Sequence, residues 1–109
     1  MHERIAIIDM GTNTFHLLVA EWQTNHFQFI HQEKQAVKIG VGGINEGVIT
    51  EAAIARALDT LKNFSATIKK MNVSKTQAFG TSALRSAQNG NEIIERIKSE
   101  TGIEAQIIS

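Results

Sequence analysis

Residues 9 to 14 combine the residue types that bind phosphate. Asp9 ends a short apolar run and is followed, after Met10, by a glycine and three small polar residues: Gly11, Thr12, Asn13 and Thr14. A glycine leaves room for a ligand and permits a positive φ, so the backbone N–H groups after it can converge on one point. Such concave sets of donors bind phosphate oxygens, and the threonine hydroxyls would add further donors. These residues are therefore candidates for a phosphate-binding turn.

Asp9, at the mouth of the same turn, is the candidate metal ligand. A carboxylate there would hold Mg²⁺ directly or through water and so neutralise phosphate charge. The same residues also fit an ordinary hairpin turn, in which Asp9 only helps to form the turn. The local pattern leaves both interpretations open.

The segment GTSALR, residues 80 to 85, is a second candidate phosphate-binding element. It is expected at the C-terminal edge of a parallel strand, where sheets of this kind place their ligand crevices. Arg85 can grip a phosphate with two parallel N–H bonds, while Thr81 and Ser82 offer hydroxyl and N–H groups. In the alternative interpretation, Thr81 or Ser82 caps a helical turn and Arg85 is a solvated surface residue. Because the two turns would end neighbouring strands, we favour a shared phosphate site.

Three antiparallel strands are expected before residue 40. Residues 5 to 8 are continuously apolar, which favours a strand covered on both faces. Phe15, Leu17 and Val19 mark the alternation of a second strand, which pairs with the first as a hairpin. A turn at Thr24-Asn25 leads to a third, longer strand, whose apolar residues keep one phase: Phe27, Phe29, Val37 and Ile39.

Two helices and two strands are expected in the rest of the chain. The glycine-rich residues 40 to 53 predict a loop that leads to a helix, with Thr50 as its N-cap and Glu51 in its first turn. Apolar residues then recur at helical spacing from Ile54 to Met71.

The last third of the sequence alternates between the two kinds of element. A strand is expected to end near Gly80 in a tight turn, and a helix is expected from Asn89 to Glu100 with Gly102 at its C-cap. Residues 103 to 108 predict a final strand, parallel to the previous one because a helix joins them.

This order, βββαβαβ, predicts an α/β fold with a mixed sheet and helices packed on it, which is the order of the ribonuclease-H-like fold. The length of 109 residues predicts a single domain over residues 1–109. We find no repeat or linker in the sequence.

Composition restricts the function further. Eleven basic and eleven acidic residues give a formal charge of zero, which argues against nonspecific binding of nucleic acid. The absence of cysteine excludes disulfides, thiolate metal sites and a cysteine nucleophile. The first residues lack the pattern of a signal peptide, and no apolar run approaches the length of about 18 residues that a membrane span needs, so we expect a soluble, cytoplasmic protein without a membrane partner.

Other polar and aromatic residues are interpreted as structural. The predicted strands contain three histidines without the spacing of a zinc site: His16, His26 and His31. Trp22 and the phenylalanines are expected to pack in the core or on the sheet rather than stack on bases. Lys34 and Lys38 could line the path of a long anion, although lysines on an outer strand also protect its edge, which is our interpretation of Lys34.

Four segments together resemble those of the exopolyphosphatase and guanosine pentaphosphate phosphohydrolase (Ppx/GppA) family. They are IIDMGTNTFHLLV, GVITEAAIARAL, FGTSALRSAQNGNEI and TGIEAQIIS, in the family's order and spacing, and they cover essentially Arg4 to Ser109. The turn alone would also resemble phosphate loops of sugar kinases and actin-like ATPases, which share the fold. Asn13 and the TSALR segment favour the phosphohydrolases.

The resemblance implies a two-lobed hydrolase of the acetate and sugar kinase, heat-shock chaperone and actin superfamily, with this chain as most of the N-terminal lobe. Such enzymes use Mg²⁺ and water to remove the terminal phosphate of inorganic polyphosphate, or the 5′ γ-phosphate of guanosine pentaphosphate to leave the tetraphosphate alarmone. The match assigns Asp9 to the first phosphate and metal motif, Gly11 to Thr14 to its loop, and Arg85 to the phosphate-gripping turn. The family's catalytic glutamate and second phosphate loop would follow Ser109, so we expect no catalytic base within this chain and little or no activity from it alone.

The sequence departs from the family at two positions and leaves alternatives open. Val41 stands where members often have an acid, and Lys38 where they often have arginine. An actin-like or sugar-kinase ATPase, or a non-catalytic sensor of alarmone or polyphosphate, stays a possible function. An uncovered edge strand or lobe face would invite a homodimer.

Overall fold

The computed structural model of the protein describes residues 2–40, 44–45 and 47–108. Val41, one of the two departures from the family pattern, lies outside these residues. The strands are β1 (Arg4–Met10), β2 (Thr14–Gln23), β3 (His26–Ala36), β4 (Ile44–Asn45), β5 (Val48–Ile49), β6 (Lys75–Gly80) and β7 (Ala105–Ile107). The helices are α1 (Glu51–Lys70), α2 (Ser82–Ser86) and α3 (Gly90–Thr101).

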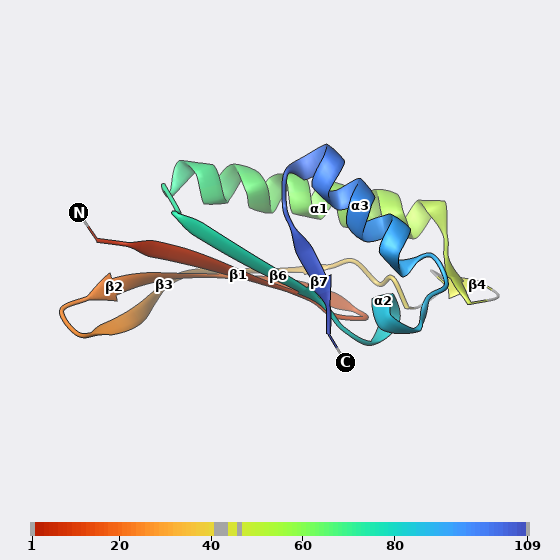
Figure 1. Ribbon diagram of the computed structural model, residues 1–109, viewed down its shortest axis with the longest axis horizontal. Coiled ribbons are helices and arrows are strands. Elements are labelled where there is room, and N and C mark those ends of the chain that lie inside the picture. Colours follow the sequence, from red (N-terminus) through yellow and green to blue (C-terminus); the bar gives the residue numbers. More distant parts are fainter. Residues whose placement is uncertain (1, 41–43, 46, 109) are drawn as a thin grey trace.

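One five-stranded mixed sheet organises the molecule, in the order β3-β2-β1-β6-β7 (Figure 1). β2 runs antiparallel to both β1 and β3, whereas β6 runs parallel to both β1 and β7. The chain passes from β6 to β7 through α2 and α3, because a parallel pair needs a crossover connection. The predicted α/β class and the ribonuclease-H-like arrangement of the main strands are confirmed.

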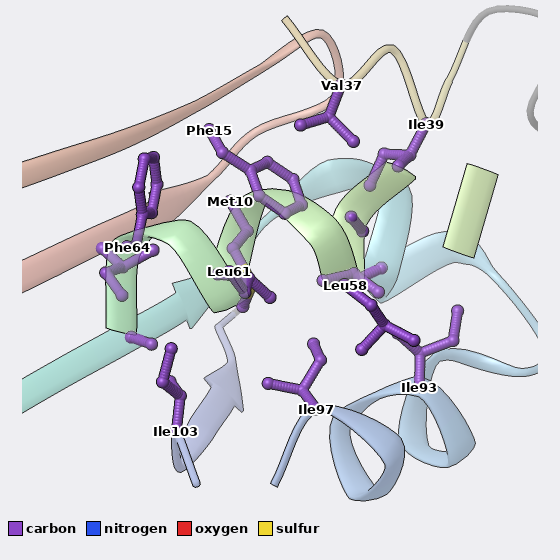
Figure 2. Packing of buried hydrophobic residues seen from close by; sticks show 14 of the residues in the cluster. Met10, Phe15, Val37, Ile39, Leu58, Leu61, Phe64, Ile93, Ile97 and Ile103 are labelled. Carbon is purple, nitrogen blue, oxygen red and sulfur yellow. The ribbon is translucent and has the colours of Figure 1, made fainter. Parts of the chain in front are cut away.

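The core lies between the sheet and two helices that share one face of it. Figure 1 shows α1 and α3 on the same side of the strands. β1 directs Ala6, Ile8 and Met10 into this layer, each no more than 1% exposed. Figure 2 shows the layer from close by, with Met10 of β1, Leu61 of α1 and Ile97 of α3 among its members.

The opposite face of β1 differs from the prediction. Successive side chains of a strand point to opposite faces, so Ile5, Ile7 and Asp9 lie on the face away from α1 and α3. The expectation that residues 5 to 8 are covered on both faces was wrong for the described residues, because both long helices pack on the same side. Ile5 and Ile7 are accordingly only half-buried.

The ends of both long helices follow the sequence signals. The Thr50 side chain accepts a hydrogen bond from the Ala53 N–H at 3.2 Å, which satisfies one free donor of the first turn of α1. α3 ends at Gly102, whose φ of 78° is the left-handed C-cap conformation. Among the described helices, none has a long enough apolar run to cross a membrane.

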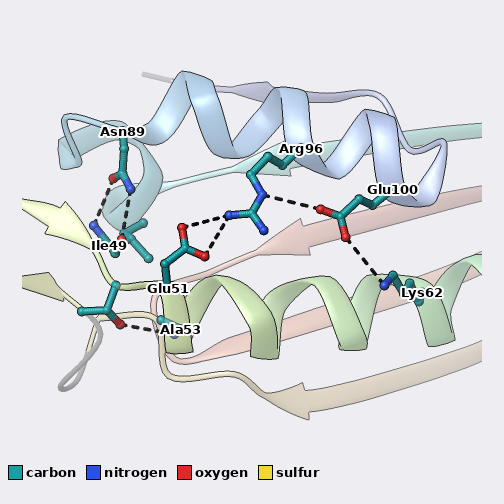
Figure 3. A network of polar contacts seen from close by, with 8 residues as sticks. Ile49, Glu51, Ala53, Lys62, Asn89, Arg96 and Glu100 are labelled. Carbon is teal, nitrogen blue, oxygen red and sulfur yellow. Dashed lines mark hydrogen bonds and ion pairs between the residues drawn. The ribbon is translucent and has the colours of Figure 1, made fainter.

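Polar contacts join α1, β5 and α3 (Figure 3). The Asn89 amide accepts from the Ile49 N–H and donates to the Ile49 carbonyl, both at 3.0 Å. Arg96 of α3 contacts Glu51 of α1 at 3.0 Å and Glu100 at 3.5 Å. Because those charged groups face solvent, the ion pairs add little stability, whereas the amide pair fixes the backbone of β5.

The third strand does not keep the predicted apolar phase. β3 ends at Ala36, and Val37 and Ile39 are buried in the segment that follows it. Phe27 and Phe29 are 43% and 65% exposed, because the β2–β3 hairpin extends past the end of α1 (Figure 1) and its register shifts between Val19 and Ala20.

The same hairpin carries two aromatic side chains that pack against each other on the sheet, one of the two placements expected for the aromatic residues. Trp22 is 41% exposed and meets Phe27 edge to face, with ring centroids 4.9 Å apart. Phe15 and Phe64 do lie in the core, as predicted. Lys34 is exposed on β3, which is an edge strand. This agrees with the interpretation that Lys34 protects the edge of an outer strand.

Short elements stand where the sequence indicates loops. The predicted loop over residues 40 to 53 contains the two-stranded sheet of β4 and β5, although residues 41–43 and 46 lie outside the described part. The predicted tight turn after Gly80 is the five-residue helix α2. β7 is shorter than the expected strand over residues 103 to 108.

Candidate functional site

The two candidate turns begin side by side at one edge of the sheet. β1 and β6 are parallel neighbours, and Met10 at the end of one lies opposite Gly80 at the end of the other. The backbone N–H and the hydroxyl of Thr81 both donate to the Met10 carbonyl, each at 3.3 Å. The structure therefore brings residues 11–14 and 81–85 to neighbouring strand ends, as the sequence predicts.

The first turn is held from behind by the segment that follows β3. The Asn13 carbonyl accepts from the N–H groups of Val37 and Lys38 at 2.9 and 3.0 Å, and the Thr12 carbonyl accepts from the Gly40 N–H at 3.1 Å. In a planar trans peptide the N–H points opposite to the C=O. The N–H groups that follow these two carbonyls, those of Asn13 and Thr14, consequently point away from residues 37–40 and toward one common side.

These amide groups suit an anion. Among the described residues, no backbone acceptor is found for the N–H groups of Thr12 and Asn13. Both residues lie at the surface, where a phosphate could reach the N–H groups. The Asn13 N–H therefore has no backbone acceptor among the described residues and also points away from residues 37–40. N–H groups exposed in this way in a turn are the donors that bind phosphate oxygens.

Gly11 is required for space rather than for an unusual backbone angle. In the described residues the glycines with a positive φ are Gly47 and Gly102, so the expected use of this freedom at Gly11 was wrong. A Cβ on Gly11 would lie only 3.0 Å from the Thr14 carbonyl oxygen, which accepts from the Gly11 N–H at 3.1 Å. A side chain at Gly11 would therefore press the turn open.

Asp9 is exposed at the end of β1, on the sheet face away from the helices. Its register partners are His16 on β2 and Phe79 on β6. Within the described part of the chain, no hydrogen bond engages its carboxylate, and no cluster of three or more metal-binding side chains occurs. Mg²⁺ commonly takes one or two carboxylates together with phosphate oxygens and water, so a single free aspartate beside a phosphate turn fits that ion.

The second turn is engaged in contacts within the chain. Because the Thr81 hydroxyl donates its proton to Met10, it is not free to donate to a ligand in this state. Thr81 occupies the N-cap position of α2 without a side-chain capping bond, and Ser82 is the exposed first residue of that helix. Arg85 is exposed, and its Nη1 donates to the Ile108 carbonyl at 2.9 Å. Its remaining donors can still point to a ligand, since a guanidinium carries five N–H groups.

The three histidines singled out in the sequence lie on the strands of the β2–β3 hairpin. His16 lies on β2 and contacts Gln32, whereas His26 and His31 lie on β3, where His31 contacts Glu33. Their placement as strand-surface residues is confirmed.

Sequence reasoning missed the residues that support the first turn. Arg56 of α1 donates to the carbonyls of Val37 and Lys38, which belong to the segment behind the turn. Gly40 packs so closely on Thr12 that a Cβ would collide with the Thr12 Cγ2. The one local signal for this segment was the pattern of Val37 and Ile39, an alternating apolar pair, followed directly by Gly40.

We expect a Gly40→Ala substitution to lower the free energy of unfolding by about 1–3 kcal/mol, as overpacking does. Thr12→Ser removes the colliding methyl group and keeps the hydroxyl, so the double variant should regain most of the lost stability. Urea unfolding of the parent, both single variants and the double variant measures this coupling. A double variant as unstable as Gly40→Ala would show that Thr12 does not limit the space at residue 40.

A groove of the described surface lies away from the two candidate turns. Its volume is about 580 Å³, and it lies between β6, β7 and α3, lined by residues such as Lys75, Glu95 and Gln106. Asp9, the first turn and Arg85 do not line it. The candidate site lies at the edge of the sheet where β1 and β6 end, apart from this groove.

Comparison with known proteins gives a consistent result. Residues 18–109 match the model of the Ppx/GppA phosphatase family. Exopolyphosphatase 1 of Mycobacterium bovis is 28% identical over 106 residues, which cover 96% of this chain and 31% of that protein. Because this alignment covers 96% of the chain, it includes the first turn, which precedes the residues 18–109 matched by the family model.

Solved structures show the same relationship. An exopolyphosphatase from Cytophaga hutchinsonii is 47% identical with a TM-score of 0.93, over 97% of this chain and 34% of that one. The Ppx/GppA family member of Aquifex aeolicus is 27% identical with a TM-score of 0.93, over 99% of this chain and 35% of that one. The chain thus spans about a third of the length of these relatives.

Proposed function

Because the chain belongs to the Ppx/GppA phosphatase family, we propose that the protein that carries it hydrolyses the terminal phosphate of inorganic polyphosphate. The name exopolyphosphatase, shared by the relatives from Mycobacterium bovis and Cytophaga hutchinsonii, supports this substrate. The chain would form most of the N-terminal lobe of a two-lobed enzyme. Guanosine pentaphosphate is the second substrate, because a turn that holds only a terminal phosphate would also accept a 5′ γ-phosphate.

One observation about the site carries the proposal. The carbonyls of Thr12 and Asn13 are both bonded to residues 37–40, so the N–H groups of Asn13 and Thr14 face the opposite side, at the strand end that also bears Asp9. Donors that are fixed in advance stabilise phosphate charge without reorganising during the reaction.

Each candidate residue then has a role. The turn from Gly11 to Thr14 would bind the oxygens of the terminal phosphate, and Arg85 would grip the same group with its free N–H donors. Asp9 would hold Mg²⁺, and Thr81 and Ser82 of the second turn would belong to the phosphate-binding site. Bound there, the ion would neutralise charge on the phosphate oxygens.

The water that attacks the phosphorus in line needs a base, which we place in the sequence after Ser109 on the basis of the family resemblance. Phosphoryl transfer depends mainly on positioning and charge stabilisation, so one side of a cleft alone should lose most of the rate. We therefore expect little or no turnover by the 109-residue chain alone.

Phosphate release tests the proposal. Full-length protein and residues 1–109 are each incubated with Mg²⁺ and long-chain polyphosphate, guanosine pentaphosphate or ATP. Release from polyphosphate or guanosine pentaphosphate by the full-length protein alone is the expected result. Release from ATP only would indicate an ATPase. Binding of polyphosphate or alarmone without release would indicate a sensor, and either result would refute the proposed reaction.

A further inference from the structure

A single arginine of α1 connects that helix to the back of the first turn. Arg56 Nε donates to the Val37 carbonyl at 2.8 Å, and Arg56 Nη2 donates to the Lys38 carbonyl at 3.1 Å. The fork of one guanidinium therefore holds two successive carbonyls of the segment behind the turn. Lysine, with one compact ammonium group, does not reproduce this geometry.

One peptide group links Arg56 to the turn. The peptide between Val37 and Lys38 accepts from Arg56 through its carbonyl and donates to the Asn13 carbonyl through its N–H, at 3.0 Å. The direction of the Asn13 carbonyl in turn sets the direction of the Thr14 N–H, because the peptide that they share is planar. Hydrogen bonds in such a chain also polarise one another.

The backbone at Lys38 needs this support. Its φ of 55° is the left-handed conformation, which is unfavourable for a residue with a side chain. Strained residues of this kind persist only where surrounding contacts hold them, and they gather at functional sites. Here the Lys38 N–H is bonded to Asn13 and the Lys38 carbonyl to Arg56, so both sides of the strained residue are held.

We propose that Arg56 is a positioning residue, which holds the peptide groups around Lys38 so that the N–H groups of Asn13 and Thr14 face the bound phosphate. This inference rests on the proposed function for its effect on turnover. Burial of Val37 and Ile39, at 1% and 2% exposure, fixes where the segment lies, whereas Arg56 fixes how its carbonyls point. Arg56 is itself exposed, so its loss should leave the core intact.

Arg96 offers a matched control. It is a second arginine with exposed contacts to α1, where it binds Glu51, but its partners lie outside the segment behind the turn. Arg56→Ala, Arg56→Lys and Arg96→Ala are therefore compared in the full-length protein. Steady-state kinetics with polyphosphate gives kcat and KM, and hydrogen exchange reports on the N–H groups of Lys38 and Gly40.

We expect Arg56→Ala to lower kcat/KM about tenfold, as the loss of a charge-assisted hydrogen bond would, with most of the change in KM. Arg56→Lys should recover part of this loss, and Arg96→Ala should leave the kinetics unchanged. Exchange at Lys38 and Gly40 should accelerate in Arg56→Ala but not in Arg96→Ala.

The two readouts separate the inference from the proposed function. A parent protein that releases no phosphate would refute the function. The exchange data would still test whether Arg56 holds the peptide groups around Lys38. Unchanged exchange at both N–H groups in Arg56→Ala would overturn the inference. So would an active parent whose Arg56→Ala and Arg96→Ala variants lose equal activity.

Discussion

Replacement of Asp9 by asparagine should lower phosphate release by the full-length protein about a thousandfold, the scale of losing several kcal/mol of charge stabilisation at a metal. The carboxylate is exposed and is not engaged in a hydrogen bond among the described residues, so its neutralisation should not unfold the protein. Asparagine keeps the shape of the side chain but removes the charge that attracts Mg²⁺. The residual activity should therefore require a higher Mg²⁺ concentration.

Asp59→Asn is the control for this prediction, because Asp59 is an exposed acid on the outer side of α1. It should leave both the rate and the Mg²⁺ dependence unchanged. Rates are measured as phosphate release across a Mg²⁺ titration, with unfolding curves for each variant. An Asp9→Asn variant with parental rate and parental Mg²⁺ midpoint would remove Asp9 from the metal site.

Arg85→Ala should lower kcat/KM for polyphosphate about a hundredfold, because a guanidinium that grips phosphate makes charge-assisted bonds of about 1.5–3 kcal/mol each. Arg85→Lys keeps the positive charge but loses the fork, so it should fall between alanine and the parent. Kinetics at several salt concentrations would measure the electrostatic part of the effect.

The contact of Arg85 with Ile108 offers a competing explanation. If Arg85 only anchors the end of the chain after β7, Arg85→Ala should lower the free energy of unfolding and leave kcat/KM near the parental value. Urea unfolding of the same variants therefore decides between an anchoring role and phosphate binding.

Periodic patterns predicted the elements that pack on the core. α1 and α3 follow from apolar spacing and from local caps at Thr50 and Gly102, and both depend on nearby residues only. The β1–β2 hairpin follows in the same way from alternation and a glycine turn. The site residues of the first turn could be proposed because their chemistry is contained in six consecutive positions, residues 9 to 14.

The features that the sequence did not predict depend on contacts between residues far apart in the chain. Phe27 and Phe29 have the alternation of a buried strand, but the length of the hairpin relative to α1 decides that they are exposed. The hydrogen bonds from Thr81 to Met10 and from Arg56 to Val37 join residues far apart in the sequence, and no local pattern signals them. The left-handed backbone at Lys38 likewise depends on partners from α1 and the first turn.

Binding of a phosphate chain by the turn from Gly11 to Thr14 is the central claim, and amide chemical shifts test it most directly. Full-length ¹⁵N-labelled protein is titrated with tripolyphosphate in the presence of Mg²⁺. We predict the largest saturable shifts at the N–H groups of Asn13 and Thr14, with smaller shifts near Arg85. Saturable binding that leaves the N–H signals of residues 11 to 14 unmoved would contradict the claim.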